Sequence, residues 1–489
     1  LKDSSFLLHT ISPYSFDVGP SGSGSAIQPR QWQTQLIQLL RRRLDGETTG
    51  EQDVLVFAGP GAGKTLGALL AFRSMRQEQR LQHFLVFCHR TSILEQWQRA
   101  AARVGLELVS WPCEQETLNQ ADGLLLTYQS AGRQPQQLAT ALDPWPASTL
   151  LAIADEAHHL GLDPEDPGAT AWSQTFEEQT SQCRLRLGLT GTPFRADNLG
   201  FCAARRIRTI QNGELVEQIQ PDLCVEPREL IAAGDVRPLE FHFQDGWVEH
   251  SQEGRPDRDV SPLSQEQRES WRARNLRRAI RLADSSCIGQ QVILQAQRRL
   301  ARVRQQQPNA AGLVIARDIE HASAIATLLE DDGDRVDLVH SQDPEAAARL
   351  DGFQAGGADW LVSIDMCAEG FDAPRLRVVA YLTTVVTRSR FLQGITRAVR
   401  MTPELAEQEP VPRNPSYVVA PADPLLMGYA RSWSVAEPYV LTSQESDQAP
   451  LSDSPGYGRG PSLPLEAVND GAGAMIRLKT PQLPSFLQR

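Results

Sequence analysis

The sequence lacks the features that mark membrane, secreted and zinc-binding proteins. Its longest apolar runs, such as residues 84–88 and 149–154, are far shorter than the roughly 18 residues that a membrane-spanning helix needs. Its first residues show no basic segment followed by an apolar one, which is the pattern of a secretory signal. The seven cysteines are scattered and include no C-x-x-C pair. We therefore expect a cytoplasmic protein with reduced cysteines and no membrane partner.

Lysine is almost absent from the chain. Lys2, Lys64 and Lys479 are the only three among 48 basic residues, so arginine supplies the positive charge everywhere else. Lys64 therefore indicates a position where a compact ammonium is required and a planar guanidinium does not serve. The 60 acidic residues give a net charge of −12, which argues against indiscriminate binding to phosphate polymers. Any nucleic-acid site must then be a local basic track.

The apolar runs fall into two blocks in a chain that is long enough for two or three domains. In each block, short runs separated by helix-like segments predict an α/β fold, with a parallel sheet covered by helices. The expected strands are residues 54–58, 84–88, 124–127, 150–154 and 187–190, then 312–316, 336–340, 360–364, 378–382 and 417–419. The expected parts are a flexible lead at 1–27, domain 1 at 28–240, a connector at 241–287, domain 2 at 288–420, and a Pro/Ser/Gly-rich, partly disordered tail at 421–489.

The segment AGPGAGKT, residues 58–65, lies where a predicted strand gives way to a predicted helix, which is the context of a phosphate-binding loop. Its glycines let backbone N–H groups curl around a phosphate, Lys64 reaches the outer phosphates, and Thr65 can ligate Mg²⁺. The alternative is a glycine-rich turn with an incidental lysine. The residues predicted to bind the nucleotide here are Gly59, Gly61, Gly63, Lys64 and Thr65.

Two carboxylates, Asp155 and Glu156, follow a predicted strand of the same block. We expect Asp155 to hold Mg²⁺ and Glu156 to polarise the water that attacks the γ-phosphate of ATP. A rival interpretation groups both carboxylates with His158 and His159 as a metal cluster, but no further ligand stands at a suitable spacing.

The phosphate loop followed by Asp-Glu-Ala-His at residues 155–158 resembles the DEAH-box superfamily 2 helicases, in particular restriction-enzyme motor subunits and excision-repair helicases. The resemblance implies two tandem RecA-like domains with ATP and Mg²⁺ in the cleft between them. Further segments follow in the family's order from Gln28 to Arg400. Residues 190–193, Thr-Gly-Thr-Pro, resemble the motif that couples the nucleotide and polymer sites.

The resemblance also assigns roles to single residues. Gln33 is expected to read the adenine, Gly370 and Asp372 to border the nucleotide, and Gln393, Arg397 and Arg400 to meet the γ-phosphate from near one face of a helix. A solvated arginine face is the alternative for the last group. The residues expected to contact nucleic acid are Arg90, Thr91, Gln96, Thr127, Gln129, Arg317 and Ser363. For any one residue of the first five, ordinary helix capping is an equal alternative. Ile364 stands where many relatives carry a hydroxyl residue.

Three functions remain in competition. The first is a self-sufficient translocase or helicase that acts in repair or recombination, on DNA by preference and on RNA as the alternative. The second is the motor of a restriction or defence assembly whose nuclease lies on a partner chain. The third is an ATP-gated clamp that switches shape on nucleic acid without moving along it.

Overall fold

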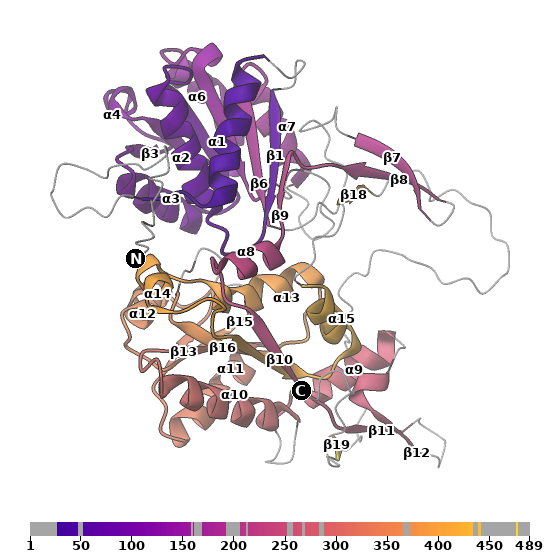
Figure 1. Cartoon of the computed structure of the whole chain (residues 1–489). Helices are drawn as coiled ribbons and strands as arrows, with labels where there is room; N and C mark the ends of the chain where they lie inside the picture. The colour runs from indigo at the N-terminus through magenta and orange to yellow at the C-terminus, as the bar shows by residue number, and fades with distance from the viewer. Residues whose placement is uncertain are drawn as a thin grey trace, which may run out of the picture. The chain divides into compact units, whose positions relative to one another are not determined.

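The computed structural model describes residues 27–46, 52–157, 160, 169–191, 206–211, 214–251, 258–266, 269–282, 288–364, 371, 373–433, 439–441 and 476–477. The chain forms two compact units that divide between Val225 and Glu226, except that Pro60–Ala62 are grouped with the second unit (Figure 1). Of the later residues, Tyr439–Leu441 belong to the first unit again. None of the described helices is both long and apolar enough to cross a lipid bilayer.

The first unit is built on a seven-stranded sheet with the order β3-β4-β2-β5-β6-β1-β9, and every strand pair in it is parallel. Its strands are β1 (Asp53–Ala58), β2 (His83–Cys88), β3 (Leu108–Ser110), β4 (Gly123–Thr127), β5 (Leu150–Asp155), β6 (Leu185–Thr190) and β9 (Leu223–Val225). Its helices are α1 (Gln31–Leu44), α2 (Lys64–Gln77), α3 (Thr91–Arg103), α4 (Gln115–Gln120), α5 (Tyr128–Arg133), α6 (Pro135–Leu142) and α7 (Ala169–Thr180). A separate antiparallel ribbon joins β7 (Arg206–Gln211), β8 (Glu214–Ile219) and β18 (Tyr439–Leu441).

The central strands β1, β5 and β6 are buried along their whole length. Helices on both faces of a parallel sheet exclude water from every position, so these strands are nearly continuous apolar runs. Asp53 and Arg186 are exceptions at the amino ends of β1 and β6, where they form a buried ion pair with 2.5 Å between Oδ1 and Nε. The polar residues that end β5 and β6, Asp155 and Thr190, lie at the opposite, carboxyl edge of the sheet.

The second unit contains a six-stranded parallel sheet with the order β10-β17-β16-β13-β15-β14. Its strands are β10 (Leu239–Gln244), β13 (Ala311–Ala316), β14 (Val336–Val339), β15 (Trp360–Ile364), β16 (Leu376–Leu382) and β17 (Ser416–Pro421). Its helices are α8 (Pro227–Ala233), α9 (Glu269–Ala279), α10 (Ile288–Arg304), α11 (Ile319–Asp331), α12 (Ala346–Gln354), α13 (Arg388–Ile395), α14 (Pro403–Gln408) and α15 (Pro424–Ser432). A small antiparallel sheet joins β11 (Trp247–Ser251), β12 (Arg258–Pro262) and β19 (Ile476–Arg477).

Two hydrophobic cores cover the two faces of this second sheet. Alternate residues of β13 divide between them, with Val314 in the core that contains α10 and α11, and Leu313 in the core that contains α12, α13 and α15. Figure 1 shows α10 and α11 together on one side of the sheet, and α13 and α15 on the other. All ten strands expected from the sequence are present, and the prediction of two parallel sheets covered by helices is confirmed.

The division between the units differs from the predicted boundary at residue 240. The reason is β10, which pairs in parallel with β17 and so belongs to the second sheet. The predicted connector also folds as part of the second unit, because Arg272 of α9 forms a buried ion pair with Asp423 (2.9 Å) and Leu276 enters the core around α10. The predicted tail contains α15, β18 and β19 among its described residues, while most of it and nearly all of the predicted lead lie outside them.

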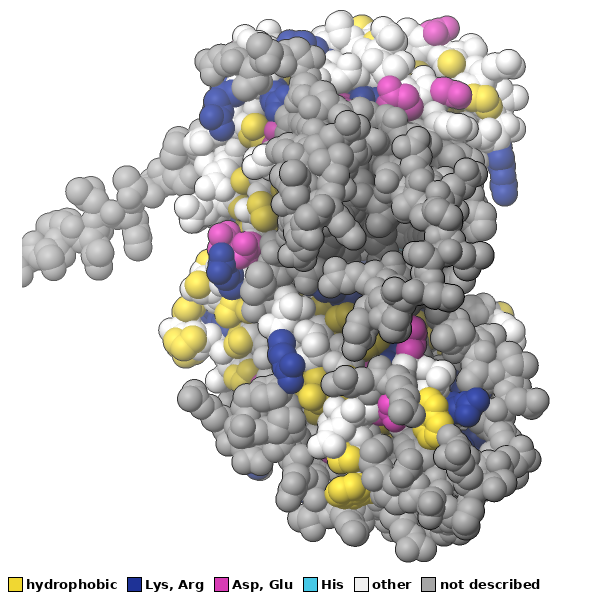
Figure 2. Space-filling view, turned by 90° about the vertical axis from the view of Figure 1, so that its right-hand side faces the viewer, with side chains coloured by type: hydrophobic (Ala, Val, Ile, Leu, Met, Phe, Trp, Pro, Cys, Tyr) yellow, Lys and Arg dark blue, Asp and Glu magenta, His cyan; other side chains and the backbone are white. Residues whose placement is uncertain are grey.

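Charges are mixed on the face of the molecule in Figure 2. Among the described residues drawn there, basic and acidic side chains stand singly or in small groups between apolar and uncharged ones. The described part of that face therefore shows no extended basic surface.

Candidate functional site

The phosphate-binding loop lies between β1 and α2, as predicted. Gly61 and Gly63 have φ angles of 77° and 79°, a left-handed conformation that is costly for residues with a Cβ. Gly63 is the N-cap of α2, so Lys64 and Thr65 open the helix and its first N–H groups point toward the loop. This geometry supports a phosphate site over an incidental turn, because a helix N-terminus favours anions.

Gln33 lies against this loop from the first turn of α1. The side chain is 1% exposed, its Oε1 accepts a hydrogen bond from the Arg30 N–H (2.9 Å), and its Nε2 donates to the Gly63 carbonyl (3.0 Å). The structure therefore brings Gln33 to the loop that follows it by thirty residues. Its role toward adenine stays a prediction.

Lys64 and Glu156 meet at the carboxyl edge of the first sheet. The Lys64 Nζ is 3.3 Å from the Glu156 Oε1 and 3.4 Å from the Ala58 carbonyl, and the two side chains are 13% and 27% exposed. The Glu156 Oε2 accepts a hydrogen bond from the Gly191 N–H (3.4 Å), directly after β6. These residues follow the adjacent strands β1, β5 and β6, which explains how distant segments converge. The Lys64 ammonium is thus paired with the Glu156 carboxylate at a position from which a phosphate could attract it.

The backbone of Glu156 is unusual, with a φ angle of 48° in the left-handed region. Such a conformation in a residue with a long side chain costs on the order of 1 kcal/mol or more and is characteristic of functional sites. It turns the chain sharply after β5, so that Asp155 remains in the sheet while Glu156 faces Lys64.

Asp155 is buried at the end of β5. Its Oδ2 accepts a hydrogen bond from the Trp97 indole N–H (2.8 Å), and its Oδ1 accepts one from the Glu156 N–H (3.1 Å). Burial, followed by the neighbouring Glu156 carboxylate, raises the pKa of Asp155, whereas Trp97 and then Lys64 oppose the increase. A buried carboxylate in this state is stabilised by a cation at short range.

The residues present fit a magnesium ion. Mg²⁺ prefers oxygen ligands, and the Asp155 carboxylate and the Thr65 hydroxyl are oxygen donors from β5 and α2. Among the described residues, no group of three or more His, Cys, Asp or Glu side chains could hold a metal ion. His158 and His159, which belong to the rival metal cluster, lie outside the described residues.

The γ-phosphate residues predicted in the second unit do not share one α-helix. Gln393 lies on α13, which ends at Ile395; Arg397 lies in the following 3-10 turn (Thr396–Val399), and Arg400 has extended backbone. The Thr396 hydroxyl donates to the Leu392 carbonyl (2.5 Å) at the point where the helix tightens, and such back-bonding bends helices. The expectation of a single helical face through Arg400 was therefore wrong.

Hydrogen bonds to other segments of the second unit hold this 3-10 turn in place. The Arg237 N–H donates to the Val399 carbonyl (2.9 Å), the Ser416 hydroxyl donates to the Ala398 carbonyl (2.7 Å), and Arg397 donates to the Phe371 carbonyl (2.7 Å). The turn is thus held in place within the second unit.

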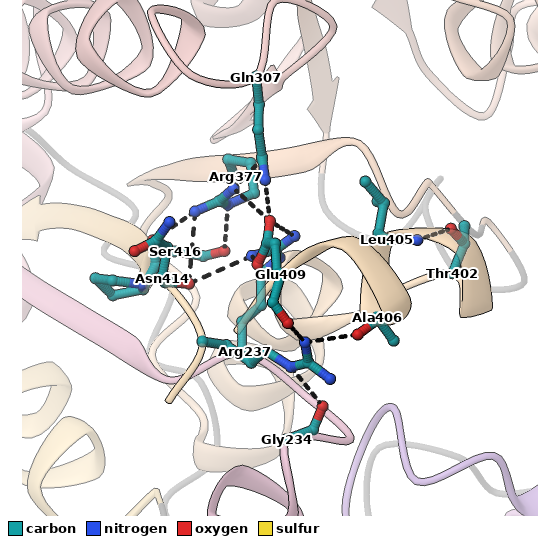
Figure 3. A network of polar contacts seen from close by, with 12 residues as sticks. Gly234, Arg237, Gln307, Arg377, Thr402, Leu405, Ala406, Glu409, Asn414 and Ser416 are labelled. Atoms are coloured by element: carbon teal, nitrogen blue, oxygen red, sulfur yellow. Dashed lines mark hydrogen bonds and ion pairs between the residues drawn. The ribbon is translucent and has the colours of Figure 1, made fainter. Parts of the chain in front are cut away.

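Arg237 and Ser416, which bond to the turn, also belong to a network of buried polar side chains that Figure 3 shows. The guanidinium of Arg237 is fully buried and pairs with Glu409, while Arg377 donates to the Ser416 hydroxyl (3.2 Å) and to Gln307. Burial, followed by the charge of Arg237, lowers the pKa of Arg377 to about 10. Two buried guanidinium groups thus share the negative charge of one carboxylate, which stabilises the network only while Glu409 is ionised.

The residues predicted to contact nucleic acid in the first unit lie beyond the carboxyl ends of two adjacent strands. Arg90 and Thr91 follow β2 and are exposed, and Gln96 lies half-buried further along α3. Thr127 and Gln129 lie where β4 meets α5, and Gln129 is exposed. The Thr127 hydroxyl accepts a hydrogen bond from the Ser130 N–H (3.0 Å) in a capping box, which is the alternative that had been left open for this residue.

Two residues predicted for the same role in the second unit lie at the ends of adjacent strands: Arg317 directly follows β13, and Ser363 is the last but one residue of β15. The Arg317 Nε lies 2.5 Å from the Asp318 carboxylate, and Ser363 is 1% exposed. Within the described part of the chain, the Ser363 hydroxyl has no hydrogen-bond partner. Gly370, Asp372 and residues 192–193 lie outside the described residues.

Trp97 and Tyr128 lie within two segments that resemble phosphate-gripping motifs, Gln96-Trp97 and residues 127–130, but the sequence did not predict that they lie near Asp155. Both are fully buried, in α3 and α5. The segments gave no signal that these two side chains point inward rather than toward a polymer.

Comparison with known proteins places the chain in a family. The model "Type III restriction enzyme, res subunit" matches residues 26–195, and "Helicase conserved C-terminal domain" matches residues 294–402. An uncharacterized protein of Mycobacterium tuberculosis (strain ATCC 25618 / H37Rv) is 30% identical over 438 residues, which are 87% of this chain and 67% of that protein. One of Mycobacterium leprae (strain TN) is 30% identical over 413 residues, which are 83% of this chain and 65% of that protein.

The fold has a counterpart among solved structures. A fragment described as an HsdR subunit of a type I restriction enzyme from Vibrio vulnificus YJ016 has 16% identity and a TM-score of 0.50, over 84% of this chain and 67% of that one. The fold and the phosphate loop define the class as P-loop proteins with two tandem RecA-like domains. The chain belongs to the superfamily 2 helicases and is related to the motor subunits of restriction enzymes. It spans about two thirds of the length of its mycobacterial relatives.

Proposed function

We propose that this chain hydrolyses ATP when it is bound to nucleic acid, most favourably DNA, and uses the cycle to move along one strand. The observation that carries the proposal is the convergence of Lys64, Asp155 and Glu156 at the carboxyl edge of the first sheet, with 3.3 Å between the Lys64 and Glu156 side chains. A strand-to-helix loop, an ammonium and two carboxylates are the groups that in-line attack on a terminal phosphate requires.

Each residue has a distinct part in this proposal. The loop N–H groups bind the phosphates, and Lys64 leaves Glu156 for the outer phosphate oxygens when the nucleotide enters. Glu156, released from Lys64, orients the attacking water and takes up its proton. Asp155 and Thr65 would hold Mg²⁺, which neutralises the charge of the phosphates when it is bound. Arg397 is assigned to the γ-phosphate in this proposal, where it would stabilise the charge that develops in the transition state.

Phosphate contacts account for the polymer side of the proposal. Arg90, Thr91 and Gln129 are placed beyond strand ends where a strand of nucleic acid can run, and contacts with the backbone carry no sequence information. Binding is therefore expected to depend little on sequence. DNA is favoured over RNA by the relationship to restriction-enzyme motors.

The test is the ATPase rate measured in parallel with single-stranded DNA, duplex DNA, RNA and no polymer. We expect stimulation by at least one polymer, and loss of turnover in Lys64→Ala with an unchanged thermal melt. Lys64→Arg is the matched control for charge, and it should also fail because a guanidinium does not fit the loop. Wild-type turnover by Lys64→Ala contradicts the assignment. A strand-displacement assay then separates a moving motor from a stationary clamp.

A second function is the motor of a restriction or defence assembly, with nuclease on a partner chain. The match of residues 26–195 to the res subunit of type III restriction enzymes favours it. If it is correct, a nuclease copurifies with the tagged chain from its native host and DNA cleavage by the assembly requires Lys64. Copurification with a repair protein instead supports the self-sufficient translocase.

A further inference from the structure

Trp97 makes a contact that packing alone does not require. The side chain is fully buried in α3, and its indole N–H donates to the Asp155 Oδ2 at 2.8 Å. The two residues are separated by 58 positions in the sequence and come from a helix and a strand end. A tryptophan that only fills a core satisfies its N–H with any nearby carbonyl; this one is bonded to the carboxylate expected to hold the metal.

The other buried side chains near Asp155 do not take over the part of the Trp97 hydrogen bond in orienting the carboxylate. Burial, followed by nearby charges that include Asp155 and Glu156, raises the pKa of the Cys88 thiol and of the Tyr128 hydroxyl, so both stay neutral. Within the described residues, the Tyr128 hydroxyl has no hydrogen-bond partner. The indole N–H therefore fixes the rotation of the carboxylate from one side, while the Glu156 N–H holds the other oxygen at 3.1 Å.

The same helix begins at the exposed Arg90 and Thr91, which are expected to grip phosphates of the polymer. Trp97 lies six positions after Thr91, which corresponds to about 9 Å along a helix axis. A helix is stiff over this length, so a small shift or rotation at its first turn moves the indole and with it the Asp155 carboxylate. α3 thus connects the residues expected to bind the polymer, at its first turn, to the expected metal ligand Asp155 through the hydrogen bond of Trp97.

We propose that Trp97 is a positioning residue that holds Asp155 in the orientation required for Mg²⁺, and that nucleic acid bound at the start of α3 acts on ATP hydrolysis through this contact. The inference rests on the proposed function. It adds a residue that touches neither nucleotide nor polymer, together with a route by which polymer binding reaches the metal ligand.

The test uses Trp97→Phe, which keeps an aromatic ring and removes the donor. The primary measurement is binding of a fluorescent ADP analogue as a function of Mg²⁺ concentration. We expect the apparent Mg²⁺ affinity to fall about 10- to 100-fold, the range for loss of a group that orients a metal ligand. Nucleotide binding in the absence of Mg²⁺ should stay near that of the wild type. Excess Mg²⁺ should restore the basal ATPase rate, whereas the stimulation by nucleic acid should remain reduced.

The matched control is Trp145→Phe, because Trp145 is also buried in the first unit but stacks on His83, with ring centroids 4.3 Å apart, away from the site. Its Mg²⁺ dependence should equal that of the wild type. If Trp97→Phe does not fold, replacing the indole of Trp97 with a benzothiophene ring of nearly equal shape removes only the N–H donor. In an Asp155→Asn background, either change at Trp97 should have no further effect on Mg²⁺ affinity, because the two act as a unit.

An unchanged Mg²⁺ dependence in a folded Trp97 variant overturns the inference, and so does a loss of turnover that excess Mg²⁺ does not relieve. Full stimulation by nucleic acid in a variant with weakened Mg²⁺ binding overturns the coupling through α3. The proposed function fails in a different way, since the wild-type chain itself would then show no ATPase activity with any polymer.

Discussion

Replacing Glu156 by glutamine should separate ATP binding from ATP hydrolysis. In the structure the Lys64 ammonium lies 3.3 Å from the Glu156 carboxylate, and the nucleotide must draw it away. The amide of Glu156→Gln removes this competitor and the repulsion between a carboxylate and the triphosphate, but it cannot accept a proton from water. We therefore expect tighter ATP binding together with the loss of turnover.

The size of both effects follows from the geometry. The two side chains are 13% and 27% exposed, so the pair is partly screened and contributes about 1 kcal/mol, at the upper end for accessible ion pairs. Its removal should lower the Kd for ATP by about fivefold. Loss of a general base costs roughly 10²- to 10⁴-fold in rate. The paired measurements are equilibrium titration with a fluorescent ATP analogue and steady-state release of phosphate in the presence of nucleic acid.

Glu95→Gln is the matched control, because Glu95 is an exposed residue of α3 whose Oε2 is 3.8 Å from Arg99. It should change neither quantity. Weaker ATP binding by Glu156→Gln would refute the idea that the Glu156 carboxylate competes with ATP for the Lys64 ammonium. Hydrolysis within a few-fold of the wild type would refute the role of Glu156 in activating water.

Three further predictions test other parts of the molecule. Arg397→Ala should keep its thermal melt and its ATP affinity but lose about 10³- to 10⁵-fold in polymer-stimulated turnover, as measured by phosphate release; a collapsed melt would instead mark Arg397 as structural. Affinity for nucleic acid should fall steeply with salt, by about 0.7 to 0.9 logarithmic units of slope per neutralised phosphate, and Arg90→Ala should weaken binding equally for unrelated sequences; a loss confined to one sequence would indicate base readout. Burial raises the pKa of the Cys183 thiol from 9.0 to about 12, against the opposing charge of Arg186. Above pH 9 the unfolded thiol ionises while the folded one does not, so the free energy of unfolding should fall by about 1.4 kcal/mol per pH unit. Cys183→Ala should reduce that slope in guanidinium titrations at pH 8 to 10; an equal slope would show that Cys183 does not cause it.

The sequence was sufficient for the central strands and for placing Lys64 and Glu156 beyond strand ends of the same α/β unit. A strand buried on both faces is a nearly continuous apolar run, so its position can be read from the order of apolar residues alone. The carboxyl ends of adjacent parallel strands lie at one edge, and polar residues that follow such strands therefore converge. Both arguments need only local sequence patterns and the fact that parallel strands end at the same edge of a sheet.

Other features depend on contacts between distant segments, and the sequence did not predict them. The hydrogen bond from Trp97 to Asp155 requires the correct rotation of α3 about its axis, which tertiary packing sets. The end of α13 at Ile395 depends on Thr396, whose hydroxyl competes for a helix carbonyl. The strand β10 was missed because it lies at the edge of its sheet, where His242 and Gln244 interrupt the apolar pattern. The roles of the predicted site residues toward nucleotide and polymer stay predictions.

The pairing of β10 with β17 has a consequence for the order in which a newly made chain can fold. β10 leaves the ribosome before almost all of the second unit, yet its partner strand is among the last segments of that unit to be synthesised. At about 5 to 20 residues per second, this strand waits on the order of ten seconds or more for β17. The first sheet takes all its strands from residues up to Val225, so its folding need not wait. A nascent chain that stalls before Ser416 would carry a finished first sheet together with the strand β10, in which Leu239, Phe241 and Phe243 alternate with polar residues and which has no partner in its own sheet. An unpaired strand of this kind is a site at which chaperones bind and at which aggregation begins.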